Sequence, residues 1–131
     1  MASELRVDTL KDSSGNNSVG MAYVSGGSAK AWANLNGNTF GLRDSFSVSS
    51  ATDQGTGDYT INFTNSMGNN DYSVSVNAGD SSKSYPRICA CGTSQDTGFA
   101  TSSHGITSLR PDTLAIDDME FVNSSVLGDL A

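Results

Sequence analysis

The stretch DQGTGDYTINFTNSMGNNDYSVSVN, residues 53–77, alternates short apolar and polar runs with clusters of Gly, Asn, Asp and Ser. In the run 59–64, every second residue is a large apolar one, and the run 72–77 repeats the pattern. This period of two is typical of β-strands with one buried face. The segment TNSMGNN between the runs predicts a short hairpin connection. The stretch therefore predicts two strands, and none of its residues stands out as a catalytic group.

The same pattern continues on both sides of this stretch. In the segment AKAWANLNG, Ala29, Ala31, Ala33 and Leu35 share one side and Trp32 lies on the other. Four residues of the next run are expected on one face: Phe40, Leu42, Phe46 and Val48. A strand is expected to begin after Pro86, because proline is best tolerated at a strand start. No window shows sustained helical periodicity with caps. These patterns predict an all-β fold, an antiparallel β-sandwich or small barrel-like domain.

Length and composition predict one domain with a thin core. The chain has 131 residues, of which 36% are hydrophobic and 16% charged, and both shares are low for a globular domain. Small buried apolar area favours oligomerisation, because neighbouring copies supply missing contacts. Large apolar side chains concentrate from residue 39 onward. We therefore expect an extended N-terminal arm or stalk with an attachment region at 1–38 and the β-sandwich domain at 39–131.

The net charge of −7 argues against several classes of partner. Nucleic acid binding requires clustered Lys and Arg, and the seven basic residues are scattered. An anionic membrane surface is disfavoured for the same reason. No apolar run has the length of a membrane span, and the N-terminus MASELRVDTLKD lacks the features of a secretory signal. We expect a protein made in a cytoplasm and kept there until assembly or lysis.

The residues with metal-binding or catalytic chemistry form no convincing site. Cys89 and Cys91 are expected to be free thiols, and with His104 as the single histidine neither a metal nor a cofactor is expected. The segment 53–58 faintly resembles a calcium turn, but a glycine turn leading into Tyr59 is the preferred interpretation. A hydrolase triad around His104 is disfavoured, because the chain has no G-x-S-x-G elbow. Asp117 and its neighbour Asp118 would point to opposite faces of a strand.

Four aromatic residues could instead form a sugar-binding platform: Trp32, Tyr59, Tyr72 and Tyr85. Core packing is the preferred use of Tyr59 and Tyr72, because both occupy strand positions. Tyr85 follows the Ser-rich loop AGDSSKS and is expected to be the exposed one. A lectin-like contact through Tyr85 therefore stays open.

The string AKAWANLNGN…FGLRDSFSVSSATDQGTGDYTINFTNSMGNNDYSVSV resembles a module of tail-fibre and related virion proteins of tailed bacteriophages. That module has a K-A-W-x-N-x-N-G segment, an R-x-S-F-N-V-S-S strand, D-x-G-T-G-D-Y-T-V-N-F-T and an A-N-Y-S-V strand. The opening SELRVDTLKDSSGNNSV and the late VNSSVLGD are also similar to segments that flank the module. The segment 78–105 follows no fixed pattern, as expected of the variable part. The resemblance covers nearly the whole chain.

The resemblance implies a non-enzymatic virion protein that forms a homotrimer. The leading hypothesis is a small trimeric tail fibre or receptor-binding module that contacts the host surface, through a glycan or a protein. Loops on a rigid sheet would make that contact, with these candidate residues: Ser81, Lys83, Tyr85, Ser94, Gln95, Asp96 and His104. Attachment to other virion proteins, of the tail or the capsid, is expected through Leu5, Val7 and Leu10.

Two other functions are compatible with the sequence. The first is a capsid decoration or cement protein (a head fibre) that stabilises the shell and is anchored by its N-terminal arm. The second is a polysaccharide depolymerase of the tailspike type. Such an enzyme needs convergent carboxylates in a groove. The chain is short and has no paired acids that can be placed together on one face, so an enzyme is disfavoured.

Overall fold

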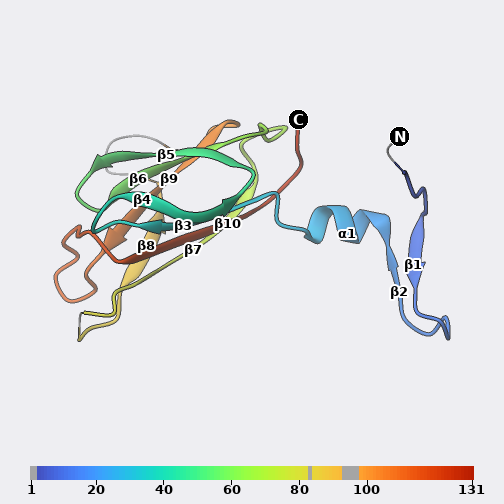
Figure 1. Ribbon diagram of the computed structural model, residues 1–131, viewed down its shortest axis with the longest axis horizontal. Coiled ribbons are helices and arrows are strands. Elements are labelled where there is room, and N and C mark those ends of the chain that lie inside the picture. Colours follow the sequence, from blue (N-terminus) through green and yellow to red (C-terminus); the bar gives the residue numbers. More distant parts are fainter. Residues whose placement is uncertain (1–2, 83, 93–97) are drawn as a thin grey trace.

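The computed structural model describes residues 3–82, 84–92 and 98–131, and within them the chain is mostly antiparallel β-structure (Figure 1). The elements in chain order are β1 (Thr9–Lys11), β2 (Ser18–Gly20), α1 (Met21–Gly27), β3 (Ala31–Asn36), β4 (Gly41–Phe46), β5 (Val48–Gly55), β6 (Asp58–Phe63), β7 (Ser73–Gly79), β8 (Ile88–Cys91), β9 (Ser103–Leu109) and β10 (Phe121–Leu127). The predicted all-β class is confirmed.

Two four-stranded sheets face each other as a sandwich. The first sheet has the strand order β4-β3-β10-β7 and the second β5-β6-β9-β8, and all pairs are antiparallel. The main buried cluster draws residues from both sheets: Ala33, Leu35 and Val122 from the first, and Tyr59, Ile61 and Ile106 from the second, together with Met119. Burial of this apolar surface between the sheets is the main stabilising contribution to the fold.

The face assignments made from alternation hold for the central strands. In β3, Ala31, Ala33 and Leu35 are buried, whereas Trp32 points outward and is 37% exposed. Tyr59 and Ile61 on β6 are 0% and 1% exposed. β3 is paired on both sides, with β4 and β10. The sandwich therefore begins at Ala31 rather than at residue 39, so the boundary between the N-terminal segment and the sandwich lies earlier in the chain than the expected residue 38.

The turn between β5 and β6 is the predicted glycine turn. Gly55 and Gly57 adopt positive φ angles of 127° and 69°, a region that side chains disfavour. One carboxylate oxygen, Asp118 Oδ1, accepts hydrogen bonds from the Gly57 amide at 2.7 Å and from the Tyr59 hydroxyl at 2.8 Å. Asp53 Oδ1 accepts from the Gly55 amide at 2.9 Å. The carboxylates of Asp53 and Asp118 thus hold the backbone of the turn, and Asp118 also holds the Tyr59 side chain of the strand that follows.

Two predicted features are wrong. Residues 64–72 do not form a hairpin connection, because β6 lies in the second sheet and β7 in the first. Phe46 does not share a face with Leu42 and Val48: Leu42 packs against the core, whereas Phe46 is 56% exposed. The reason for the difference between Leu42 and Phe46 is an irregularity in the β3–β4 pairing, where Leu35 pairs with Leu42 but Asn34 pairs with Asp44, so that Phe46 pairs with the outward Trp32. Ser47 then adopts a φ of 56° between β4 and β5, where the chain changes sheets and reaches Val48.

Residues 3–29 form the β1–β2 hairpin and the short helix α1, and they extend from one end of the sandwich (Figure 1). The sequence predicted no helix, so α1 is a further difference. None of its residues is buried, and no residue of 3–29 belongs to either buried cluster. Nothing in the helical part of the described chain has the length and hydropathy of a membrane span.

Candidate functional site

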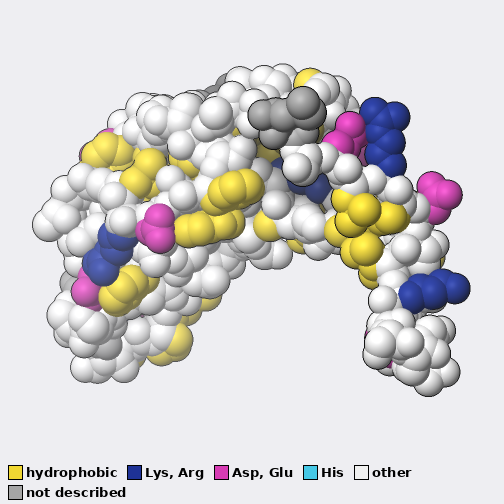
Figure 2. All heavy atoms as spheres, turned by 45° about the vertical axis from the view of Figure 1, so that its right-hand side comes forward, with side chains coloured by type: hydrophobic (Ala, Val, Ile, Leu, Met, Phe, Trp, Pro, Cys, Tyr) yellow, Lys and Arg dark blue, Asp and Glu magenta, His cyan; other side chains and the backbone are white. Residues whose placement is uncertain are grey.

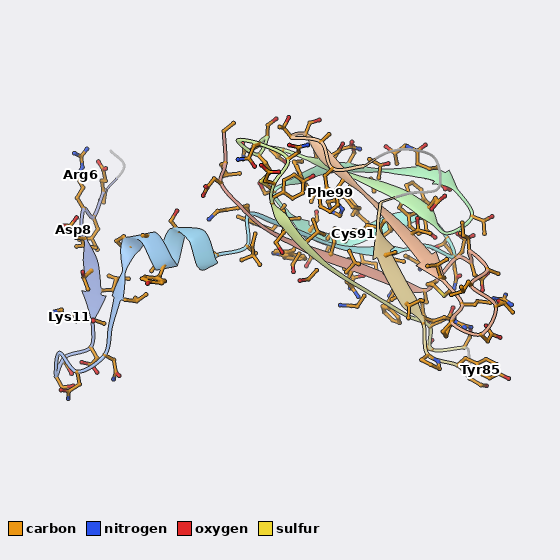
Figure 3. The ribbon with its side chains drawn as sticks, turned by 180° about the vertical axis from the view of Figure 1, so that it is seen from behind. Arg6, Asp8, Lys11, Tyr85, Cys91 and Phe99 are labelled. Carbon is orange, nitrogen blue, oxygen red and sulfur yellow. The ribbon has the colours of Figure 1, made fainter. Side chains whose placement is uncertain are left out.

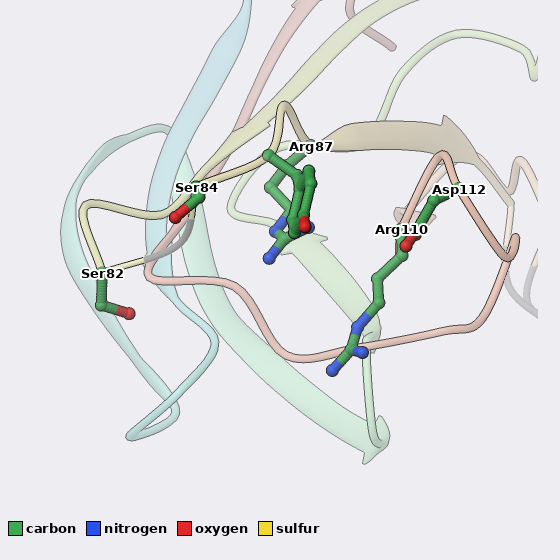
Figure 4. A pocket seen from close by; sticks show the side chains of 6 residues that line it. Ser82, Ser84, Arg87, Arg110 and Asp112 are labelled. Atoms are coloured by element: carbon green, nitrogen blue, oxygen red, sulfur yellow. The ribbon is translucent and has the colours of Figure 1, made fainter.

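The connection between β7 and β8 and the residues after β9 enclose a pocket of about 300 Å³ (Figure 4). Its lining is polar apart from one aromatic ring: Ser82, Ser84, Tyr85, Arg87, Arg110 and Asp112. The pocket lies in the connections next to one edge of the second sheet, where β8 pairs with β9. Strands of the sandwich therefore support both of its walls.

Hydrogen bonds within the β7–β8 connection fix the wall that carries the serines. Asp80 Oδ1 accepts from the Ser82 amide at 2.9 Å and from the Ser82 hydroxyl at 2.6 Å. Glu120, which directly precedes β10, accepts from both the amide and the hydroxyl of Ser81. The Ser82 hydroxyl is the main cause of a lowered pKa for Asp80, and the Ser81 hydroxyl plays the same part for Glu120. Asp80 and Glu120 are therefore ionised carboxylates, and in that form they hold the loop.

Two guanidinium groups also line the pocket, that of Arg87 from the β7–β8 connection and that of Arg110 from the residues after β9. Arg110 Nε donates to Asp117 Oδ2 at 2.7 Å, and this bond is the main cause of the raised pKa of Arg110. Arg87 Nε is buried and has no hydrogen-bond partner among the described residues. Figure 4 shows both guanidinium groups directed to the same side of the pocket. Two cationic side chains thus line the same pocket, and one of them has a buried nitrogen without a partner in the described residues.

Tyr85 is 64% exposed, as the sequence predicted. It precedes Pro86, and a residue before proline is restricted to extended conformations. Tyr59 and Tyr72 are 0% and 7% exposed, so the predicted core positions of both are confirmed. Of the three tyrosines in the proposed platform, only Tyr85 offers its ring to a ligand.

The other predicted contact residues have different outcomes. Ser81 lies next to the pocket, but its hydroxyl is bonded to Glu120. Four of the predicted contact residues, Lys83, Ser94, Gln95 and Asp96, lie outside the described residues. The sequence reasoning missed Arg87 and Arg110 altogether. Both adjoin a proline, Pro86 or Pro111, in a chain with two prolines, and this is the signal that could have identified them.

His104 is not a contact residue in this fold. It lies in β9 rather than in a loop, its side chain is 0% exposed, and its ring is 5.7 Å from that of Phe63. Its Nδ1 lies 3.3 Å from the Gly105 carbonyl oxygen, whereas Nε2 is buried without a partner in the described chain. Burial lowers the pKa of His104. His104 is therefore a neutral core residue.

The N-terminal hairpin is the second candidate surface. Leu10 and Val19 face each other across β1 and β2, and a depression of about 300 Å³ lies beside them, lined also by Lys11, Asp12, Asn17 and Ser18. Leu5 is 79% exposed, Val7 36% and Leu10 42%. Figure 2 shows hydrophobic side chains gathered on the N-terminal segment, at the right of the view. All three predicted attachment residues are therefore accessible.

The two cysteines are free, as predicted, although they differ in exposure. Cys89 packs against the main buried cluster and burial raises its pKa to about 12, whereas Cys91 is exposed with Sγ 3.7 Å from the Val74 carbonyl oxygen. Across residues 3–82, 84–92 and 98–131, no three His, Cys, Asp or Glu side chains are grouped as a metal site.

The two candidate surfaces lie at opposite ends of the molecule. Figure 3 shows Tyr85 at the far end of the sandwich, whereas Arg6, Asp8 and Lys11 mark the hairpin at the other end. The sandwich separates them, so each can contact a different partner at the same time. Comparison with known protein families, curated proteins and solved structures found no match.

Proposed function

We propose that this chain is a non-enzymatic structural protein of a tailed-phage virion, a small tail fibre or receptor-binding module. The observation that carries the proposal is the separation of the hairpin from the pocket around Tyr85 by the length of the sandwich (Figure 3). A virion protein that contacts a host needs one end for attachment and another for contact. The resemblance of residues 29–76 to the phage module supplies the biological setting.

In this proposal the hairpin end attaches to the virion. A two-stranded hairpin alone is marginally stable in water, and α1 buries none of its residues. Leu5, Val7 and Leu10 would gain burial from contacts with another chain, because their apolar side chains are exposed. We also propose a homotrimer, in which three such segments cover one another's apolar side chains.

The contact end is tested by competition for host adsorption. Purified protein is mixed with host cells before phage is added, and the rate of phage adsorption is measured. Wild-type protein is expected to slow adsorption, whereas Tyr85→Ala is expected to slow it less. Arg6→Gln is the control, because Arg6 lies on the hairpin at the opposite end (Figure 3). Unchanged adsorption with wild-type protein would rule out host contact.

A second candidate is a capsid decoration protein, and the exposed apolar residues of the hairpin favour it equally well. In that case the hairpin binds the capsid shell and the sandwich points outward. Deletion of residues 1–28 is expected to abolish binding to expanded capsids. Gold-labelled antibody on intact virions separates the two candidates, since label on the tail supports the first and label over the head supports the second.

A further inference from the structure

We propose that the pocket around Tyr85 binds a single oxyanion, a carboxylate or a phosphate, carried on a sugar. This inference rests on the proposed function in one respect, since both treat the end of the molecule with the pocket as a contact surface. The sequence left a sugar contact through Tyr85 open, and the inference adds the acidic group on that sugar and the residues that would bind it. Three observations support it, concerning charge, unused donors and the aromatic ring.

The first observation is the placement of positive charge in an acidic chain. The net charge is −7 and the chain has seven basic residues in all, yet Arg87 and Arg110 line the same pocket. Two cations facing one space repel each other unless an anion lies between them. The planar guanidinium group also matches the geometry of carboxylate and phosphate, to which it can donate two parallel hydrogen bonds.

The second observation is a buried donor without an acceptor. Arg87 Nε is buried and unpartnered within the described residues, and buried polar groups are normally paired. Arg110 uses its Nε for Asp117. The terminal nitrogens of Arg87 and Arg110 are thus the groups that a ligand oxygen would meet, and no acceptor among the described residues competes for the Arg87 Nε.

The acidic neighbours limit the ligand to one negative group. Asp112 also lines the pocket, and Asp117 partly offsets the charge of Arg110. With two arginines against these two carboxylates, the pocket cannot hold a long polyanion, and the surrounding acidic protein would repel one. A ligand with one anionic group and several neutral hydroxyl groups fits this balance.

The third observation selects a sugar as the carrier. Tyr85 is 64% exposed and offers an aromatic face, against which the apolar face of a sugar ring can pack. The hydroxyls of Ser82 and Ser84 lie in the same lining. Ser84 can donate and accept a hydrogen bond, whereas Ser82 donates to Asp80 and can accept one from a ligand. Sugar hydroxyl groups need this mixture of partners.

The test is a calorimetric titration of the full-length protein with four ligands. Galacturonic acid and galactose 6-phosphate are expected to bind, whereas galactose and inorganic phosphate are each expected to bind about tenfold more weakly or not at all, because each lacks half of the contacts. Added salt is expected to weaken the binding of both acidic sugars, since the interaction is partly ionic.

The variants locate the site. Arg87→Gln is expected to weaken galacturonic acid binding about tenfold, the loss that follows from removing one charge-assisted hydrogen bond. Arg6→Gln makes the same change in charge on the hairpin and is expected to bind as wild type. Thermal unfolding of each variant checks that the fold is intact. Tyr85→Ala is expected to weaken all sugars without changing the salt dependence.

Each alternative result would overturn one part of the proposal. Equal binding of galactose would overturn the oxyanion, and equal binding of inorganic phosphate would overturn the sugar. No binding of any ligand at millimolar concentration, or equal losses in Arg87→Gln and Arg6→Gln, would overturn the site. Sugar binding by a protein that leaves phage adsorption unchanged would keep the site and refute the proposed function. Slowed adsorption by a protein that binds none of these sugars would refute the site and keep the proposed function.

Discussion

Replacement of Gly57 by Ala tests how closely the β5–β6 turn is packed. Gly57 has a φ of +69°, and a Cβ atom there would collide with the Ile116 side chain and come 2.9 Å from both N and O of the Asp117 backbone. The left-handed conformation costs a residue with a side chain about 1–2 kcal/mol. Crowding of this kind costs about 1–3 kcal/mol more. Adding the two ranges, we expect the free energy of unfolding to fall by about 2–5 kcal/mol.

Alanine variants of two other glycines separate the conformational cost from the cost of crowding. Gly55 has a φ of +127° but no atom within 4 Å of a built Cβ, so Gly55→Ala should show only the conformational cost, about 1–3 kcal/mol. Gly41 has open space and no positive φ, so Gly41→Ala should be neutral or stabilising by up to about 1 kcal/mol. Urea unfolding followed by Trp32 fluorescence gives all three values. A Gly57→Ala variant no less stable than Gly55→Ala would refute the packing of residues 116–117 against the turn.

Three further predictions concern the core, the thiols and the N-terminal segment. Because burial lowers the pKa of His104, the unfolded chain takes up a proton more readily, so stability should fall as the pH drops below about 6.5. Urea unfolding of His104→Leu should show a shallower loss over that range, and parallel curves would contradict the assignment. A thiol reagent should label one cysteine per folded chain, Cys91, because Cys89 is packed against the core and its pKa is raised to about 12. Both should react in urea, and equal rates in the folded protein would be inconsistent with this packing. Deletion of residues 1–28 should leave the melting temperature of the sandwich nearly unchanged, since neither buried cluster includes any of the described residues 3–28. A drop of many degrees by calorimetry would show that the segment supports the core.

The sequence predicted which faces are buried better than it predicted which strands pair. A period of two identifies the inward side of β3 and β6, because alternation follows from strand geometry alone. Each of these strands pairs with its chain neighbour on one side, but the partner on the other side, β10 for β3 and β9 for β6, is distant in the chain. No local pattern specifies such a pairing, so the stretch 53–77 looked like neighbouring strands although β6 and β7 belong to different sheets.

The remaining misses have local causes. Ser47 adopts a φ of 56° where the chain changes sheets, and serine carries no strong preference that would have predicted this. α1 has seven residues, two of them the glycines at its C-terminal end, which is too short for a helical period to be recognised. The pocket was found only in part, because Tyr85 stood out as an aromatic residue after a flexible loop. Arg87 and Arg110 come from different connections, and only the antiparallel pairing of β8 with β9 brings those connections together.

The position of β10 within the first sheet has a consequence for synthesis of the protein. β10 is the last strand along the chain, yet it lies between β3 and β7. Until it emerges from the ribosome, both neighbours present unpaired backbone edges, which invite pairing with other chains. Hairpins such as β5–β6 can form early, whereas insertion of β10 is a late step with long-range contacts, the kind that slows folding. Production of this protein should therefore be sensitive to temperature and to chaperones, because aggregation competes with the arrival of a single strand.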